Sequence, residues 1–117
     1  MSFFRREVID FALDQETLKL AQEQRDWIAR DPANPRPYYH LALFYRMQYN
    51  QDFALGLLLE AVRLDPHFAD AHIALTEIYA VRADYPAAWR HARAASQNGK
   101  EEGTALLLRH QIPDPAA

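Results

Sequence analysis

The sequence lacks cysteine entirely and contains only three glycines in 117 residues. Without thiols, the chain forms neither disulfides nor thiolate metal sites. The three glycines are too widely spaced for a loop that cradles a phosphate group. The longest apolar run, residues 53–59, contains Gly56 and is far shorter than the roughly 20 residues that span a bilayer. These shortages exclude disulfide scaffolds, glycine-rich nucleotide sites and membrane-spanning helices.

The N-terminal segment also lacks the uninterrupted apolar run of a signal peptide. Arg5, Arg6, Glu7 and Asp10 lie among its apolar residues. The segment has too little basic character for an amphipathic helix that binds a membrane surface. We therefore expect a soluble cytoplasmic protein with no membrane partner.

Charge is balanced rather than of one sign. Thirteen Lys and Arg residues oppose sixteen Asp and Glu residues, which gives a formal net charge of -3. The basic residues are scattered, whereas binding to nucleic acid needs clustered cations, so no nucleic acid partner is expected. Half of the residues are apolar and a quarter are charged, as in ordinary globular proteins. The length suits a single domain over residues 1–117.

What the sequence does contain is an internal repeat. Asp31 and Pro32 return 34 positions later as Asp65 and Pro66. Further matches at the same offset are Leu41 with Leu75, Tyr45 with Tyr79, Ala54 with Ala88, and Ala61 with Ala95. So many matches at one offset indicate a repeated structural unit.

Each unit predicts a pair of helices. In the first unit, Tyr38, Leu41, Ala42 and Tyr45 follow the spacing that places side chains on one helical stripe. We expect helices over residues 37–47 and 53–64, then over 69–81, then from 84–86 until Gly99. Gly99 suits the left-handed conformation that often ends a helix. A short helix is expected over residues 101–110.

The first unit resembles the tetratricopeptide repeat (TPR) family at eight positions in order. They are Tyr38, Leu41, Ala42, Tyr45, Ala54, Leu58, Ala61 and Pro66. The second unit keeps four of these and has His72, Thr76, Ala92 and Lys100 at the others. The resemblance implies an all-α fold, an α–α superhelix in which antiparallel helix pairs form a right-handed solenoid. It implies about seven helices, including a C-terminal capping helix.

The resemblance also divides the domain. Residues 1–33 form a degenerate first repeat, 34–67 and 68–99 form two repeats, 100–111 form the capping helix, and 112–117 form a tail. In the first segment, five residues fall in register, namely Phe4, Val8, Phe11, Trp27 and Pro32. Glu7, Leu20 and Gln24 do not fit the pattern. Because Trp27 stands where the other units have alanine, we expect a different helix spacing there.

For function, the resemblance implies a protein-protein interaction module or scaffold. A peptide or protein segment would bind on the concave face formed by the first helix of each repeat. The residues expected on that face are Arg36, Tyr39, Leu43, Arg46 and Met47 from one unit, and Asp70, Ile73, Glu77, Ala80 and Val81 from the next. Apolar contacts would supply affinity, and Arg46 or Glu77 would orient the ligand. The alternative for Leu43, Met47 and Ile73 is simple burial under neighbouring helices.

No catalytic, cofactor or metal site is expected. The five histidines lack the i, i+4 pairing that places two metal ligands on one helix face. Neither Ser2 nor Ser96 has the context of a nucleophile elbow. Glu101 and Glu102 suit the first turn of a helix better than a catalytic pair. We expect a protein that is not an enzyme.

The second functional hypothesis is self-association. A short stack of helices leaves apolar surfaces with few neighbours, which a homodimer would bury. The candidate contacts are Phe3, Phe4 and the leucines of residues 106–108. This alternative would make the chain a structural or assembly protein.

Overall fold

The computed structural model describes the backbone of residues 2–116 and the side chains of residues 15–116. Its six helices are α1 (Ser2–Arg30), α2 (Pro35–Met47), α3 (Gln51–Leu64), α4 (Ala69–Val81), α5 (Tyr85–Gln97) and α6 (Glu102–Arg109). No strand occurs within residues 2–116, and the predicted all-α fold class is confirmed. The helices that the sequence predicted for the two central units begin and end within about two residues of α2 to α5.

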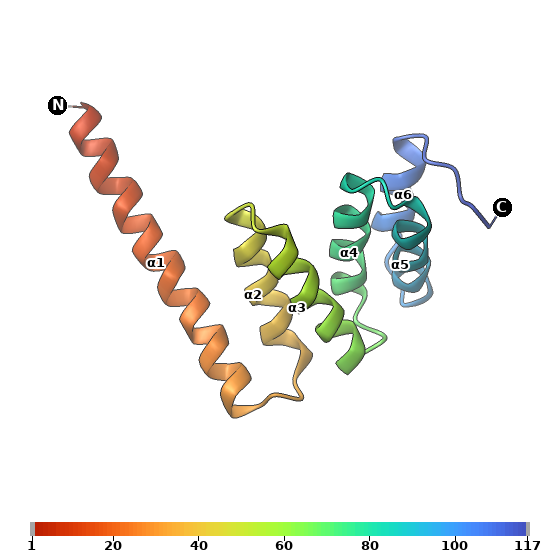
Figure 1. The fold of residues 1–117 in the computed structure, drawn as a ribbon, viewed down its shortest axis with the longest axis horizontal. Helices are drawn as coiled ribbons and strands as arrows, with labels where there is room; N and C mark the ends of the chain where they lie inside the picture. The colour runs from red at the N-terminus through yellow and green to blue at the C-terminus, as the bar shows by residue number, and fades with distance from the viewer. Residues whose placement is uncertain (1, 117) are drawn as a thin grey trace.

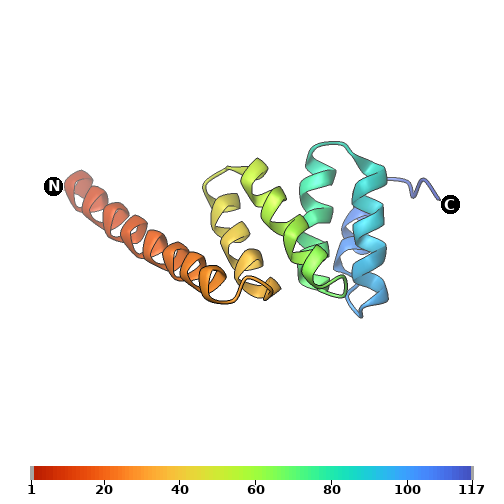
Figure 2. The ribbon, with the colours of Figure 1, turned by 60° about the horizontal axis from the view of Figure 1, so that its bottom comes forward.

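The helices stand side by side in an elongated row that measures 56 × 38 × 23 Å (Figures 1 and 2). The pairs α2 with α3 and α4 with α5 make the most extensive contacts. Each pair then packs on its neighbour, since α1 contacts α2, α3 contacts α4, and α6 contacts both α4 and α5. The surface of a helix pair that is not buried between its own two helices is therefore buried only against the next helix in the row.

Polar caps start three of the helices, α2, α3 and α5. Asn34 caps α2, and its side-chain oxygen accepts a hydrogen bond from the Arg36 amide at 3.0 Å. Asn50 caps α3, and Asp84 caps α5 by accepting from the Ala87 amide at 3.3 Å. Such caps satisfy amide groups that have no partner inside the helix.

The turns within the two units share one backbone feature. Tyr49 has φ 58° after α2, and Ala83, its equivalent 34 positions later, has φ 60° after α4. This left-handed conformation lets the chain reverse between antiparallel helices. Gly99 has φ 90° after α5, which confirms its predicted role at the end of that helix.

Small residues allow the helices of a pair to lie close together. Fully buried alanines occupy the contact between α2, α3 and α4, namely Ala42, Ala54, Ala61 and Ala71. Leu58 and Leu75, also fully buried, fill the space around them. A second cluster contains Ala88, Trp89, Ala92 and Leu107, and it attaches α6 to α5. Larger side chains at the alanine positions would separate the helices.

The N-terminal segment differs from the expectation. The sequence predicted about seven helices, with a degenerate repeat in residues 1–33, but residues 2–30 form the single helix α1. Glu16 occupies the position that is equivalent to the caps Asn50 and Asp84. Gln15 occupies the position of the left-handed residues Tyr49 and Ala83. Neither Gln15 nor Glu16 stops a helix, because both have high helix propensity and glutamate is a poor N-cap. The chain therefore continues without a turn, and six helices result.

Two histidines are buried together between α4 and α5. The Nδ1 atoms of His72 and His91 lie 3.0 Å apart, and Nε2 of His72 lies 2.8 Å from the carbonyl oxygen of Pro66. Because only an N–H can bond a carbonyl, Nε2 of His72 donates. Neutral His72 then accepts at Nδ1 from the Nδ1–H of His91. The ring of Tyr79 stacks on His91 at 5.6 Å.

This burial makes stability depend on pH. Desolvation, followed by the influence of His72 and Arg90, lowers the pKa of His91 from 6.5 to about 4. The unfolded chain therefore binds more protons than the folded one between these values, and stability falls as the pH drops through the window. Because one pKa unit corresponds to about 1.4 kcal/mol, we expect the free energy of unfolding to fall by up to about 3 kcal/mol over this window. Urea unfolding monitored by circular dichroism measures it.

The matched control for this prediction is a second histidine. His91→Leu should flatten the dependence between pH 6.5 and about 4, whereas His40→Leu, at an exposed histidine of α2, should leave it unchanged. Equal slopes in the wild type and His91→Leu would contradict the assignment.

Two helical glycines differ in their surroundings, which gives a second prediction. A Cβ on Gly56 would meet nothing within 4 Å, so Gly56→Ala should raise the unfolding free energy by about 0.5–1 kcal/mol through helix propensity. A Cβ on Gly103 would lie 3.3 Å from Cα of Ala92 and from Oγ1 of Thr76. Gly103→Ala should therefore bring no gain or a loss. An equal gain at both positions in chemical denaturation would contradict close packing of α6.

Candidate functional site

Two hollows lie along the row of first helices. The upstream hollow, of about 370 Å³, is lined by Leu43, Arg46, Met47, Tyr49 and Gln51. The downstream hollow, of about 520 Å³, is lined by Arg46, Glu77, Ala80, Val81, Tyr85, Leu106, Leu107, His110 and Ile112. Arg46 belongs to both and lies at their boundary.

The two hollows are related by the repeat. Four residues of the upstream hollow return 34 positions later in the downstream one, where Leu43 corresponds to Glu77, Arg46 to Ala80, Met47 to Val81 and Gln51 to Tyr85. The fold thus forms a concavity at two equivalent places, each at the C-terminal end of a first helix and the start of its partner, and α6 and the tail add a further wall to the downstream one. Its chemistry changes from one unit to the next because the side chains differ.

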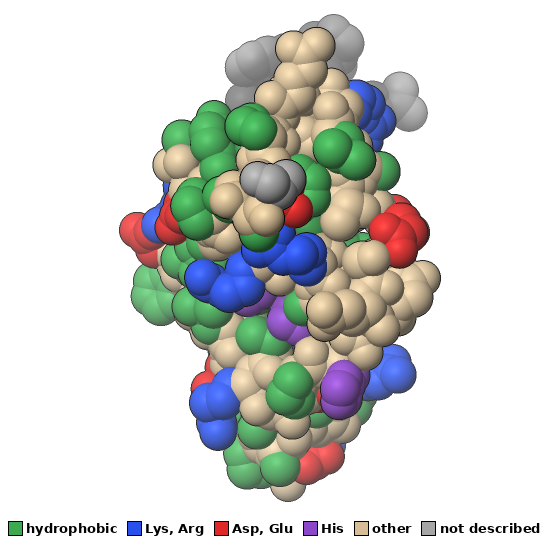
Figure 3. Space-filling model, turned by 90° about the vertical axis from the view of Figure 1, so that its right-hand side faces the viewer, with side chains coloured by type: hydrophobic (Ala, Val, Ile, Leu, Met, Phe, Trp, Pro, Cys, Tyr) green, Lys and Arg blue, Asp and Glu red, His purple; other side chains and the backbone are tan. Residues whose placement is uncertain are grey.

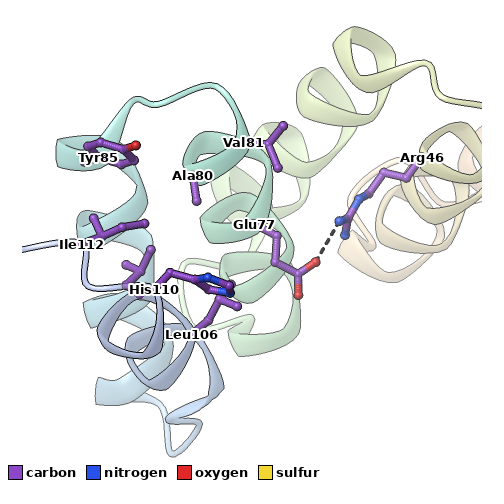
Figure 4. Close-up of a pocket in the computed structure, with 9 residues that line it drawn as sticks. Arg46, Glu77, Ala80, Val81, Tyr85, Leu106, His110 and Ile112 are labelled. Carbon is purple, nitrogen blue, oxygen red and sulfur yellow. Dashed lines mark hydrogen bonds and ion pairs between the residues drawn. The ribbon is translucent and has the colours of Figure 1, made fainter.

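The downstream hollow has largely apolar walls from several elements. Ala80 and Val81 come from α4 and Tyr85 from the start of α5, while Leu106 of α6 and Ile112 of the tail face them (Figure 4). Val81 is 73% exposed. The hollow therefore presents apolar surface to solvent.

An ion pair forms one edge of this hollow. Nη2 of Arg46 on α2 donates to Oε2 of Glu77 on α4 at 2.8 Å, as the dashed line in Figure 4 shows. Both side chains are partly exposed. The pair links two first helices and leaves hydrogen-bonding capacity on both groups, because a guanidinium has five N–H donors and a carboxylate several acceptor sites.

A polar strip adjoins the ion pair. The ring of Tyr39 packs against Phe68 at 5.1 Å between centroids. Partial burial raises the pKa of the Tyr39 hydroxyl, and the nearby carboxylates of Asp70 and Glu77 add to that rise. Asp70 itself pairs with Lys100, with 2.6 Å between Nζ and Oδ1. The influence of both carboxylates on its hydroxyl indicates that Tyr39 of α2 lies near Asp70 and Glu77 of α4.

The sequence named ten residues for the concave face, and the structure brings six of them to the hollows. These are Leu43, Arg46, Met47, Glu77, Ala80 and Val81. Tyr39 and Asp70 belong to the polar strip, Arg36 is exposed at the start of α2, and Ile73 is partly buried on α4. Met47 is 67% exposed, so neighbouring helices do not cover it.

Sequence patterns did not indicate Tyr85, His110 or Ile112 as lining residues. The only signal for Tyr85 was its place in the repeat, where aromatic residues are common. His110 and Ile112 follow α6, and their position depends on contacts outside the repeat. Nε1 of Trp89 donates to the Ile112 carbonyl at 3.2 Å, and Arg93 pairs with Asp114 at 2.6 Å. These two bonds fix the tail against α5.

No protein-family model matches the sequence, and no curated protein matches it. A proposal for the function of this chain is therefore argued from the geometry of its surface.

Other kinds of site have less support among the described residues. No group of three or more His, Asp or Glu side chains within residues 15–116 lies close enough to hold a metal ion. The described helices include none with the length and apolar character needed to cross a bilayer. On the C-terminal face, basic, acidic and hydrophobic side chains are interspersed (Figure 3).

The ion pair gives a third prediction. Arg46→Ala, Glu77→Ala and the double variant form a cycle whose coupling energy we expect to be about 0.5–1 kcal/mol, because both groups are partly exposed. The Glu60 and Arg63 pair on α3, three residues apart, serves as control with a smaller expected coupling, because both groups are fully open to solvent screening. Urea unfolding of both cycles measures the difference. A coupling energy above about 2 kcal/mol between Arg46 and Glu77 would mean that the pair mainly stabilises the fold and is not available to bind a ligand.

Proposed function

We propose that this chain is a protein-interaction module of the tetratricopeptide type, and that the downstream hollow binds a peptide or protein segment. The observation that carries the proposal is the hollow itself. About 520 Å³ of largely apolar concavity is rimmed by the pair Arg46 and Glu77. The right-handed solenoid expected from the family belongs to the same proposal.

The chemistry of the hollow suggests how a segment binds. An apolar side chain of the ligand would enter between Val81, Tyr85 and Leu106, where its burial supplies most of the affinity. Arg46 and Glu77 would bond polar groups of the ligand backbone or a charged side chain at the edge. The repeat relationship lets an extended segment continue into the upstream hollow, so that side chains of the ligand occupy both concavities.

The proposed role is that of a scaffold, without catalysis. A concavity that combines apolar walls with one ion pair is suited to recognition. The cytoplasmic location expected from the sequence is part of the same proposal.

The test begins with a selection from a phage-displayed library of linear peptides on the purified chain. Calorimetry then compares the selected peptides on two variants. Val81→Asp places a charge in the hollow and should weaken binding by about tenfold or more, equivalent to about 1.4 kcal/mol. Leu108→Asp is the matched control, because Leu108 is a similarly exposed aliphatic residue, at 65% against 73%, and does not line either hollow.

Circular dichroism of both variants shows whether the helices are retained. Peptides that lose affinity only for Val81→Asp support the proposal. A library that yields no binding peptide, or peptides that bind both variants equally well, would overturn it.

A further inference from the structure

The outer face of α3 is exposed to solvent. The inner sides of this helix pack on α2 and α4, and Figure 2 shows α3 along the near side of the row. Four exposed residues follow one another on it at intervals of four, three and four positions, namely Asp52, Gly56, Leu59 and Arg63. This spacing keeps residues within one narrow strip of a helix. We call these four residues the outer stripe.

The centre of the outer stripe is less polar than the equivalent positions of the other units. In place of Gly56 and Leu59, those positions carry longer polar side chains, namely Gln22 and Arg25 in α1, and Arg90 and Arg93 in α5. A Cβ on Gly56 would meet nothing within 4 Å among the described residues, so the centre is an open notch. Leu59 borders the notch, and Phe53, next to the stripe, is 62% exposed. The outer face of α3 therefore presents apolar surface with a gap that a side chain of a partner can enter.

The two ends of the outer stripe carry opposite charges. Asp52 lies in the first turn of α3 and Arg63 in the last, and their side chains are 89% and 67% exposed. Each has a partner in its own chain, since Arg82 donates to Asp52 and Arg63 donates to Glu60. A carboxylate has several acceptor sites and a guanidinium five N–H groups, so both ends can still bond a partner. Because these charges are already paired, they favour one direction of approach more than they add affinity.

The pattern of the outer stripe is the same when it is read from either end. Positions 52 and 63 are equally far from its centre, and so are positions 56 and 59. Two α3 helices that pair antiparallel about this centre therefore place Asp52 of each copy beside Arg63 of the other. Leu59 of each copy then lies over the notch at Gly56 of the other. A parallel pair would instead bring the two aspartates together and the two arginines together.

We propose that the partner of the outer stripe is a second copy of this chain, docked in this antiparallel registry with twofold symmetry. A twofold contact requires a surface that is complementary to itself, as the outer stripe is. The glycine lets the two helix backbones approach closely, and the leucines fill the space above it. Arg63 also comes within reach of the exposed ring of Phe53, which adjoins Asp52 on the other copy, and a guanidinium is attracted to such a ring.

This contact leaves the hollows of the concave face open. No residue of the outer stripe lines either hollow. A dimer would therefore carry the concave face twice and offer two sites to one ligand.

The first test fills the notch. Light scattering of the full-length chain over a concentration series should show a monomer–dimer equilibrium, and Gly56→Arg should weaken the dimer by at least about tenfold. The fold tolerates arginine at this position, because Arg90 is exposed at the equivalent position of α5. Gln22→Arg is the matched control, because it introduces arginine at the equivalent exposed position of α1, and it should leave the dimer unchanged. Circular dichroism checks that both variants keep their helices.

The second test reverses the charges at the ends of the stripe. Asp52→Arg and Arg63→Asp should each give a several-fold weaker dimer than the wild type, because like charges then meet at both ends. The double variant should regain most of the lost affinity, since it exchanges the two charges and opposite charges meet again in an antiparallel pair. In a parallel pair like charges would still meet, and no affinity would return.

Four results would overturn the proposal. The first is a wild-type chain that is monomeric at all concentrations, and the second is equal weakening by Gly56→Arg and Gln22→Arg. The third is a double charge variant that dimerises no better than the single variants. The fourth is a dimer that Gly56→Arg leaves intact but Leu108→Asp dissociates, which would place the contact on α6. None of these results depends on peptide binding in the hollows, so the two proposals succeed or fail separately.

Discussion

The close approach of antiparallel helices is the constraint on which the rest of the structure depends. A pair of amphipathic helices buries one side of each helix in its own contact and leaves the other side exposed. Alanine at Ala42, Ala54 and Ala61 lets the helices of one pair approach, and Ala88 and Ala92 do the same for the next. Each pair must then stack on a neighbour to complete its burial. An elongated row of helices follows, and with it a surface formed by the first helix of each pair.

That surface explains why the hollows recur with the period of the repeat. The turn after each first helix uses the same left-handed residue, Tyr49 or Ala83, so the following helix starts from the same position in each unit. A concavity therefore forms at both places, and the downstream one is extended by α6 and the tail. At the positions that correspond to Arg46 and Gln51 of the upstream hollow, the downstream hollow has Ala80 and Tyr85, so its wall is more apolar there. One fold thus offers two neighbouring sites of different chemistry, which favours recognition of a segment with a defined order of side chains.

Local patterns in the sequence were sufficient for the two central units. The caps Asn50 and Asp84, Gly99, and the apolar spacing of α2 to α5 act over a few residues, so their effect can be predicted without knowledge of the fold. Most of the residues that the sequence predicted for the concave face line the hollows, because the register of a helix fixes which of its residues lie on the same side. It did not indicate His110 and Ile112. Their place depends on bonds from Trp89 and Arg93, which lie far away in the sequence and carry no pattern of their own.

The N-terminal segment shows how small local preferences decide a larger arrangement. The apolar register of residues 1–33 favours a helix pair, but Gln15 and Glu16 favour continuation of the helix. A turn would require a left-handed residue and a cap, whereas continuation adds backbone hydrogen bonds at once. The structure follows the local preference, and apolar surface on Leu20 is left without cover. At the other side of the row, α6 covers α4 and α5, with Gly103 against Ala92. The two ends of the row therefore differ in how completely neighbouring helices cover them, and this difference arises from local preferences at Gln15 and Glu16 rather than from the repeats themselves.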